Sequence, residues 1–276
     1  MPRTPTSRLN NLKADLKQMR SVLIAYSGGT DSVFLAKTAR DTLKDNATAI
    51  TAASPMYPQK ELKEAKQLAK KIGIRHIIID TGKTQLSSIK KNTENRCYDC
   101  KKELFKKLKE IASKNNIPYV LDATNLDDLT DYRPGIKALR ELNIKSPLVD
   151  AKLTKKDIRH LSKNMGLDTW DKPSSACLAS RIPYGTQITK KHLEQIEKSE
   201  NIIKKLGIEQ LRIRHHGTTA IIEVLKKDIP ILLKHSKKIT RKLKQLGFTY
   251  ITIDLEGYRQ GSLNEVLKNE TDAKRL

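Results

Sequence analysis

The chain has 276 residues, of which 37% are hydrophobic and 31% charged, a composition typical of a folded globular protein. It has no apolar run approaching the ~20 residues that cross a bilayer, and its basic N-terminal segment lacks the apolar core of a secretory signal. We therefore expect a cytoplasmic protein without membrane contacts. The net charge of +23 favours polyanionic partners, either nucleotides or nucleic acid.

The first half of the chain alternates between short apolar runs and amphipathic segments. Strands are predicted at residues 22–26, 47–53, 74–80 and 118–122, and helices at 31–43, 59–71 and, after a polar loop, 98–114. Strands separated by single helices indicate an α/β fold with a doubly wound parallel sheet. Such sheets bind ligands beyond the carboxyl ends of their strands, where residues 27–32, 54–56 and 123–128 fall.

A cluster of proline, serine and glycine at residues 172–185 marks a change of pattern. Beyond it we predict helices at 189–206 and 229–246, and strands at 211–216, 220–225 and 249–255. These elements form a smaller α/β unit. We therefore expect two domains, residues 1–175 and residues 176–276, the second of which binds substrate or forms oligomer contacts.

The segment after the first predicted strand reads Ser27-Gly28-Gly29-Thr30-Asp31-Ser32. Glycines let the backbone turn sharply and approach a ligand, and the hydroxyls add donors. The following helix directs free N–H groups and its positive dipole end to the same place, which suits pyrophosphate. The alternative is an ordinary strand-to-helix turn. The GxxxxGK[ST] pattern of Walker-type loops is absent.

This segment resembles the SGGxDS signature of the PP-loop ATP pyrophosphatases, which have a HUP-like fold. The resemblance implies that ATP is cleaved between its α and β phosphates, adenylating a substrate oxygen. The run Asp122-Ala123-Thr124-Asn125-Leu126-Asp127-Asp128 is similar to a second motif, whose carboxylates would hold Mg²⁺ against the phosphates. A plain Asp/Asn-rich turn is the alternative. The implied ATP contacts are Ala25, Ser27, Gly28, Gly29, Thr30, Asp31, Ser32, Met56, Thr124, Asn125, Asp128 and Arg133.

Three cysteines are present, Cys97 and Cys100 in a CxxC pattern at a helix start and Cys177 in the later loop. An odd count without a secretory signal favours metal or redox chemistry over a disulfide scaffold. Three interpretations remain open from the residues. The thiolates could hold three corners of a [4Fe–4S] cluster. The CxxC could be half of a zinc site, which lacks a fourth cysteine. Or Cys177 is a sulfur carrier beside a redox pair.

Residues 173–185 read PSSACLASRIPYG, and this segment resembles the LarE family. LarE enzymes are sulfur transferases that build the nickel-pincer nucleotide of lactate racemase. The resemblance covers nearly the whole chain and includes RCYDCK at residues 96–101, DATNLDD at 122–128, DYRPG at 131–135 and DLEGYRQGS at 254–262.

The resemblance implies that a carboxylate of pyridinium-3,5-dicarboxylate mononucleotide is adenylated and converted to a thiocarboxylate. Members that sacrifice their own cysteine lack the CxxC, whereas three-cysteine members bind a [4Fe–4S] cluster. We therefore predict that Cys97, Cys100 and Cys177 are catalytic cluster ligands. The sulfur would come from exogenous sulfide or a sulfur donor protein, and the resemblance implies a homo-oligomer.

Period-2 alternation places Arg212 and Arg214 on one face of a predicted strand, where they suit a phosphate or carboxylate. A solvent-facing basic strand is the alternative. Arg181 and Arg259 are further predicted substrate contacts. From the family we transfer a metal-binding role to Glu200 and Glu223. One departure is Ile221, where the family pattern has an arginine.

Other functions compete with sulfur transfer to a small nucleotide. A [4Fe–4S]-dependent tRNA thiolase would use the same adenylation and the basic charge, but the few aromatic residues and the lack of a separate RNA-binding module argue against it. An amide-forming ligase would leave the three cysteines without a role. A nucleotide-sensing binding module would not release pyrophosphate.

Overall fold

The computed structural model describes residues 4–130, 134–173, 176–259 and 261–265. The chain divides into two compact units. The first comprises Met1–Ile89 and Glu94–Ser175, and the second comprises Lys90–Thr93 and Ala176–Leu276. The segment Lys90–Thr93 therefore belongs to the second unit although it lies far earlier in the sequence. In the described ranges no helix is both long and apolar enough to span a membrane.

The first unit is built on a parallel sheet of the four predicted strands. They are β1 (Val22–Ala25), β2 (Ala47–Ala53), β3 (Arg75–Asp80) and β4 (Tyr119–Leu121), in the order β3-β2-β1-β4. This sheet and the smaller one of the second unit confirm the predicted α/β fold class. All four strands end at one edge, the edge at which the predicted phosphate loop begins.

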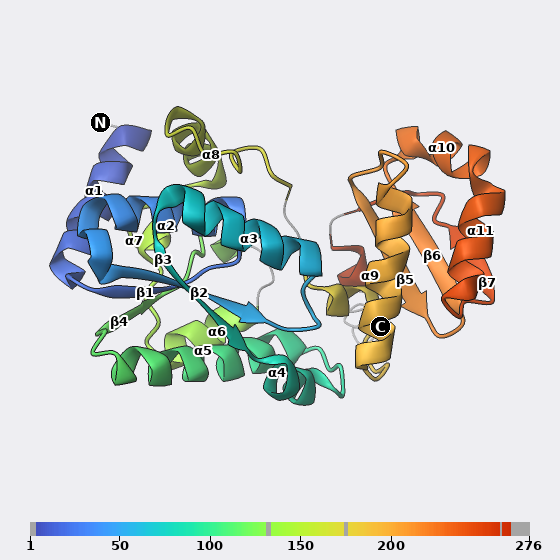
Figure 1. Cartoon of the computed structure of the whole chain (residues 1–276), viewed down its shortest axis with the longest axis horizontal. Helices are drawn as coiled ribbons and strands as arrows, with labels where there is room; N and C mark the ends of the chain where they lie inside the picture. Colours follow the sequence, from blue (N-terminus) through green and yellow to red (C-terminus); the bar gives the residue numbers. More distant parts are fainter. Residues whose placement is uncertain (1–3, 131–133, 174–175, 260, 266–276) are drawn as a thin grey trace, which may run out of the picture. The chain divides into compact units, whose positions relative to one another are not determined.

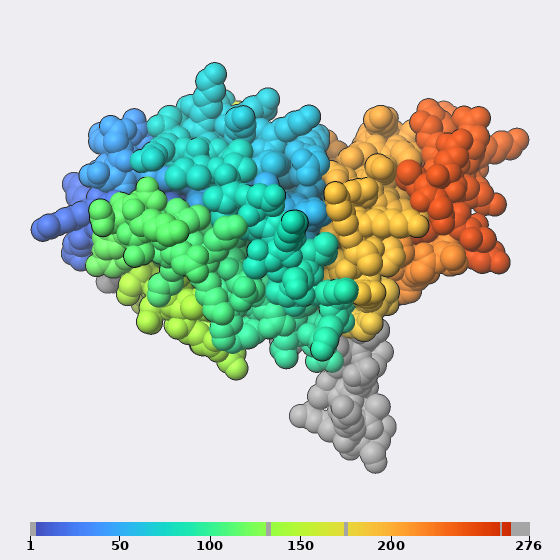
Figure 2. Space-filling model, turned by 60° about the horizontal axis from the view of Figure 1, so that its bottom comes forward, coloured from blue at the N-terminus to red at the C-terminus, as the bar shows by residue number. Residues whose placement is uncertain are grey.

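Helices cover both faces of this sheet (Figure 1). Val22 and Ile24 are fully buried in the core on one face, and Leu23 is fully buried in the core on the other. The helices on the first face are α1 (Pro5–Met19), α2 (Thr30–Leu43), α3 (Gln59–Ile72), α7 (Pro147–Asp150) and α8 (Lys155–Asn164), and those on the second are α4 (Gly82–Ile89), α5 (Arg96–Lys114) and α6 (Gly135–Glu141). Figure 2 shows the green segment that contains α5 on the outer surface of this unit.

Five helices in the described part of the first unit were not predicted: α1, α4, α6, α7 and α8. In α1, the Thr4 hydroxyl accepts a hydrogen bond from the Ser7 backbone, while Leu12 and Leu16 are fully buried at an i,i+4 spacing. The predicted polar loop after β3 contains α4. There the Asp80 carboxylate accepts a hydrogen bond from the Gly82 N–H at the helix start, at 2.8 Å.

The second unit is a three-stranded sheet with helices. It contains β5 (Leu211–His216), β6 (Thr219–Val224) and β7 (Tyr250–Ile253), with β5 antiparallel and β7 parallel to the central β6. Its longer helices are α9 (Lys190–Lys204), α10 (Ile229–Lys234) and α11 (Ser236–Gln245). The short 3₁₀ helices of the two units are η1 (Lys44–Asn46), η2 (Asp127–Thr130), η3 (Leu178–Arg181), η4 (Lys226–Asp228) and η5 (Ser262–Asn264).

The prediction of one continuous helix over residues 229–246 is wrong. The chain leaves helical geometry at His235, which separates α10 from α11. The apolar spacing of Leu232, Ile239 and Leu243, all buried in the core of the second unit, is compatible with an unbroken helix. The apolar pattern therefore gave no indication of the break at His235.

Candidate active site

The phosphate loop requires glycine at position 28 for two reasons. Gly28 has a φ of +76°, and a Cβ there would lie 2.8 Å from the Cβ and 2.9 Å from the Cα of Ala65 on α3. Because L side chains avoid this φ and because the contact is too close, only glycine fits without strain. The loop therefore packs directly against α3 at Ala65.

The loop leads into the N-terminus of α2. Gly29 is the N-cap residue and has no side chain, so the first N–H groups of α2 stay available for an anion. The Ser27 and Ser32 hydroxyl oxygens lie 3.1 Å apart, and the Gly29 N–H donates to Ser27 Oγ at 3.3 Å. The Thr30 hydroxyl faces another way and donates to the Thr169 carbonyl at 2.7 Å.

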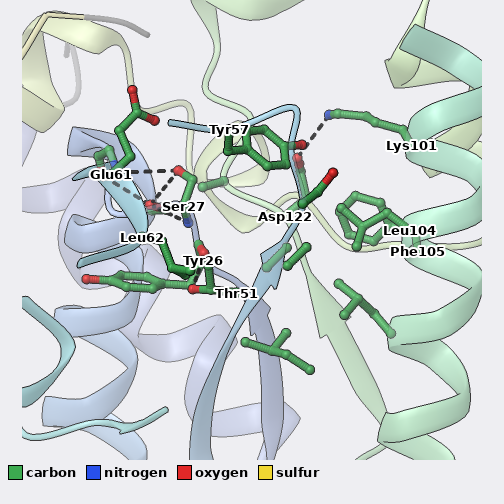
Figure 3. A pocket seen from close by; sticks show the side chains of 18 of the residues that line it. Tyr26, Ser27, Thr51, Tyr57, Glu61, Leu62, Lys101, Leu104, Phe105 and Asp122 are labelled. Atoms are coloured by element: carbon green, nitrogen blue, oxygen red, sulfur yellow. Dashed lines mark hydrogen bonds and ion pairs between the residues drawn. The ribbon is translucent and has the colours of Figure 1, made fainter. Parts of the chain in front are cut away.

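A cavity of about 300 Å³ lies beside this loop, at the carboxyl ends of the strands (Figure 3). This volume is within the range of small-molecule sites, which starts at about 300 Å³. Seven of the predicted ATP contacts line it: Ala25, Ser27, Gly29, Asp31, Ser32, Thr124 and Asp128. The sequence therefore located the polar side of the cavity.

Other predicted ATP contacts lie next to the cavity rather than on its wall. Met56 is 1% exposed, and Asn125 is 2% exposed. The Asn125 side-chain oxygen accepts hydrogen bonds from the backbone of Asp127 and Asp128, at 3.0 and 3.2 Å, so it shapes the turn that presents Asp128. Arg133 lies outside the described residues.

Two lysines hold the phosphate loop. Lys155, the first residue of α8, contacts both carboxylate oxygens of Asp31, at 2.7 and 2.8 Å. Lys172 donates to the Gly28 carbonyl at 3.3 Å and to Glu64 of α3 at 2.9 Å. Each ammonium is also paired with a carboxylate, so the two lysines serve to fix the loop and its neighbours in place.

Asp122, at the end of β4, is a carboxylate of the cavity wall held by several hydrogen bonds. It accepts hydrogen bonds from the Thr124 backbone and hydroxyl, at 3.0 and 2.9 Å, and from the Ser146 hydroxyl at 2.9 Å. The Lys101 ammonium lies 3.5 Å from its second oxygen. In Figure 3, Lys101 extends from its helix toward Asp122 over the cavity.

The apolar side of the cavity was missed by sequence reasoning. Leu62 of α3 and Leu104, Phe105 and Leu108 of α5 line it, together with Ile50 of β2. The signal was present as helical i,i+3 and i,i+4 spacing on α5. The sequence analysis predicted this helix but did not assign its apolar residues to a ligand site. Lys101, Tyr57 and Glu61 were also not predicted as lining residues.

The CxxC begins α5, as predicted. Cys97 is exposed and Cys100 is partly buried, both on the first turn of the helix. Gln85 of α4 is 1% exposed, and its side-chain nitrogen donates to the Cys100 sulfur at 3.6 Å. The Thr81 hydroxyl donates to the oxygen of the same amide at 2.6 Å, which fixes the amide orientation. Cys100 is thus held as a hydrogen-bond acceptor.

In the second unit, Arg181 fixes the loop that carries Cys177. Arg181 is 1% exposed and forms a buried ion pair with Glu200 of α9, with bonds of 2.8 and 3.2 Å. Its remaining nitrogen donates to the carbonyls of Ala176 and Cys177, at 2.7 and 3.0 Å. All three nitrogen atoms of this guanidinium therefore donate hydrogen bonds within the protein.

Arg214 makes a similar clamp from β5. It pairs with Glu223 of β6 at 2.8 and 2.9 Å and donates to the Ser180 carbonyl and the Ser262 hydroxyl, each at 2.6 Å. The two arginine–glutamate pairs therefore hold the loop around Cys177 from two elements. Buried pairs of this kind are costly to break because one charge is then left uncompensated.

Arg212 differs from the other predicted substrate-binding arginines. Among the described residues it contacts no carboxylate; it donates to the Leu211 carbonyl at 2.8 Å and lies over the Tyr258 ring at 5.1 Å. Burial, together with the nearby Arg181 charge, lowers its pKa. Arg259 instead contacts Glu256 and Glu265, at 2.8 and 3.2 Å. Among the predicted substrate-binding arginines, Arg212 is therefore the one whose guanidinium is best able to bind an anion.

In the part of the chain that the structure describes, no three His, Cys, Asp or Glu side chains are grouped as metal ligands. Glu200 and Glu223 are each paired with an arginine. Their metal-binding role stays a prediction, and the contacts give both carboxylates a structural role. The histidines likewise form no ligand set in these ranges.

The chain is similar to known proteins over most of its length. The NAD synthase family profile matches residues 7–116. An uncharacterized protein of Synechocystis sp. is 41% identical over 263 residues, covering 95% of this chain and 98% of the relative. The pyridinium-3,5-bisthiocarboxylic acid mononucleotide synthase of Lactiplantibacillus plantarum is 37% identical over 267 residues, covering 96% of both chains. An uncharacterized protein of Methanocaldococcus jannaschii is 33% identical over 250 residues, covering 91% and 95%.

Proposed function

The chain belongs to the LarE family of PP-loop enzymes, and from that premise we propose that it is an ATP-dependent sulfur transferase. Its substrate is pyridinium-3,5-dicarboxylate mononucleotide, and its product is the thiocarboxylate precursor of the nickel-pincer nucleotide. The observation that carries the proposal is the cavity bounded by the SGGTDS loop, in a chain with these full-length relatives.

ATP binds in this cavity of the first unit. Its adenine lies against the apolar side formed by Leu62, Leu104 and Phe105, and its phosphates lie at the N-terminus of α2. Asp128 and Asp31 line the polar side, and Mg²⁺ usually takes one or two carboxylates together with the phosphates. In the structure Asp31 is paired with Lys155, so it would bind the metal only by exchanging that partner. The donor set therefore fits a magnesium–ATP complex.

The reaction needs ATP because a carboxylate oxygen is a poor leaving group. A substrate carboxylate oxygen forms a bond to the α-phosphorus while the α–β bridging bond breaks, and pyrophosphate leaves. The carboxyl carbon then carries AMP as a leaving group. Sulfur attacks this carbon, AMP departs with the oxygen, and a thiocarboxylate remains. Each sulfur inserted consumes one ATP.

The sulfur is delivered through Cys97, Cys100 and Cys177. Thiolates are the ligands of iron–sulfur clusters, and the fixed acceptor role of the Cys100 sulfur suits a ligating thiolate, which carries no proton. We propose that the three cysteines hold a [4Fe–4S] cluster. When bound, it supplies one iron without a protein ligand, at which sulfide can be carried. Cys177 is then a retained ligand, and sulfide or a sulfur donor protein renews the sulfur.

The loop geometry supports this use of Cys177. Arg181 holds the Cys177 carbonyl, and the chain leaves the second unit at Thr93, shortly before Cys97. Asn92 in that segment is fully buried and donates to the Pro183 carbonyl at 2.6 Å. Two segments that lead to cysteines are thus tied to one loop of the second unit.

The substrate phosphate binds at Arg212, which contacts no carboxylate among the described residues, with Arg181, Arg214 and Arg259 shaping its surroundings. Ile221 stands where the family pattern has another arginine, so Arg212 carries more of this binding here. We also propose a cytoplasmic homo-oligomer, in which Glu200 and Glu223 remain candidate metal ligands. A tRNA thiolase is not favoured, because the Lactiplantibacillus plantarum relative is named as a synthase of a mononucleotide.

The test combines ATP, the dicarboxylate mononucleotide and sulfide with anaerobically reconstituted protein. We expect pyrophosphate release that depends on the mononucleotide, together with a thiocarboxylate product. Arg212→Ala should raise the KM for the mononucleotide at least tenfold, since hydrogen bonds to charged groups contribute about 1.5–3 kcal/mol. Alanine at the exposed Arg75 of β3 is the control. Pyrophosphate release with tRNA and none with the mononucleotide would contradict the proposal.

A further inference from the structure

The side chain of Lys101 passes directly over Gly135 on its way to the cavity. Gly135 is the buried first residue of α6, and a Cβ added there would lie 2.6 Å from Lys101 Cδ, 3.2 Å from Cγ and 3.3 Å from Cε. The residue is helical, so alanine suits its backbone conformation. The requirement for glycine therefore comes from the lysine stem that crosses it.

The Lys101 ammonium keeps donors for a ligand. Among the described residues its one hydrogen-bond acceptor is Asp122 Oδ2, at the long distance of 3.5 Å. An ammonium has three N–H groups, and Asp122 already accepts hydrogen bonds from Thr124 and Ser146. Lys101 also lines the cavity with the phosphate-loop residues (Figure 3). Asp122 thus orients the ammonium without consuming its donors.

Building on the function proposed above, we propose that Lys101 is a catalytic residue for adenylation and that Gly135 is its positioning residue. The reaction brings a substrate carboxylate against the α-phosphate, and two anions repel each other. An ammonium that contacts both lowers this repulsion while the new oxygen–phosphorus bond forms and pyrophosphate leaves. Lys101 keeps its proton throughout and acts as a fixed positive charge.

The structure sets the size of both effects. Removing one fixed donor from the site of developing charge typically costs ~10²–10³-fold in kcat. A Cβ at position 135 would need to stand about 3.5 Å from the lysine carbons rather than 2.6 Å, so the stem must shift by about 1 Å. A misplacement of that size can cost ~10²-fold.

The first experiment compares Lys101→Met with Lys106→Met, both on α5, by pyrophosphate release from ATP and the dicarboxylate mononucleotide. Lys106 is exposed and does not line the cavity. We expect Lys101→Met to lose ~10²-fold or more in kcat, and Lys106→Met to match the wild type. Wild-type protein that releases no pyrophosphate overturns the proposed function. Active wild type with an equally active Lys101→Met overturns this inference alone.

The second experiment separates positioning from a structural role for Gly135. Gly135→Ala is measured in the wild type and in Lys101→Ala, which has no stem to displace. We expect a loss of ~10- to 100-fold in the wild type and no further loss in Lys101→Ala. The thermal midpoint of Gly135→Ala should stay within a few degrees of the wild type, because the lysine stem can move aside. An equal loss in both backgrounds would overturn the positioning role.

Discussion

Gly28→Ala tests whether the phosphate loop is built as the structure describes. The substitution places a side chain at φ +76°, which costs ~1–2 kcal/mol for an L residue. It also brings a methyl group 2.8 Å from the Ala65 Cβ, and overpacking of this kind costs ~1–3 kcal/mol. The sum is about 2–5 kcal/mol if the loop keeps its conformation.

Urea denaturation followed by tryptophan fluorescence measures this cost. Trp170 is the single tryptophan of the chain and belongs to the first unit, so its emission reports the unfolding of that unit. We expect the free energy of unfolding to fall by at least 2 kcal/mol. If the loop instead moves to relieve the strain, the stability loss shrinks and the Kd for ATP, measured by calorimetry, rises at least tenfold.

Gly29→Ala is the matched control, because a Cβ at that position would meet its nearest atom, Ser27 Oγ, at 3.4 Å and no positive φ is involved. It should cost about 1 kcal/mol or less, the usual effect of alanine at a helix N-cap. The reasoning would be refuted if Gly28→Ala unfolded at the wild-type urea concentration and bound ATP with the wild-type Kd.

Three further predictions concern other groups. Glu200→Ala should destabilise the second unit by ~3–5 kcal/mol, because a fully buried guanidinium loses its carboxylate; a loss below 1 kcal/mol in circular dichroism melts would contradict the ion-pair role. Burial and the nearby His192 lower the pKa of His215 below its ordinary 6.5, so the unfolded chain takes up the proton first. The free energy of unfolding should therefore fall as the pH drops below 6.5, by up to about 1.4 kcal/mol per unit, and be flat above it. His215→Gln should reduce this slope but not abolish it, because the pKa values of His76 and His216 are lowered as well. The same change at the exposed His160 should leave the slope intact, and an unchanged slope in His215→Gln would be contrary evidence. Gln85→Leu should retain iron after anaerobic reconstitution but lower the cluster reduction potential by up to about 60 mV, the equivalent of one hydrogen bond for a one-electron couple; an unchanged potential would show that the amide does not act on the cluster.

The parallel sheet was predictable because each of its elements has a local signal. Short apolar runs such as residues 47–53 were predicted as strands and form buried strands. The loop Ser27-Gly28-Gly29 directly follows such a strand. The polar side of the cavity followed from the same logic, because parallel strands end at one edge. The sequence did not reveal which apolar residues of α5 line the cavity, because Phe105 and Leu108 belong to the core as well.

The roles of the charged residues were the harder part. Arg181, Arg212 and Arg214 are equivalent in a sequence pattern, and only their partners distinguish them. Two are paired with Glu200 and Glu223, whereas Arg212 makes no ion pair within the described ranges. The contact between Gly135 and the Lys101 side chain could not be predicted for the same reason, since the two residues are more than thirty positions apart in the chain.

Sulfur transfer itself is tested most directly by one anaerobic measurement. Iron-reconstituted protein is incubated with ATP, the dicarboxylate mononucleotide and excess sulfide, and pyrophosphate, the product mass and the mass of the peptide that contains Cys177 are followed together. We predict one pyrophosphate per sulfur inserted, more than one turnover per chain and an unchanged Cys177 peptide. A single turnover with a Cys177 peptide that has lost its sulfur would contradict the renewable source, and an unmodified mononucleotide would contradict sulfur transfer.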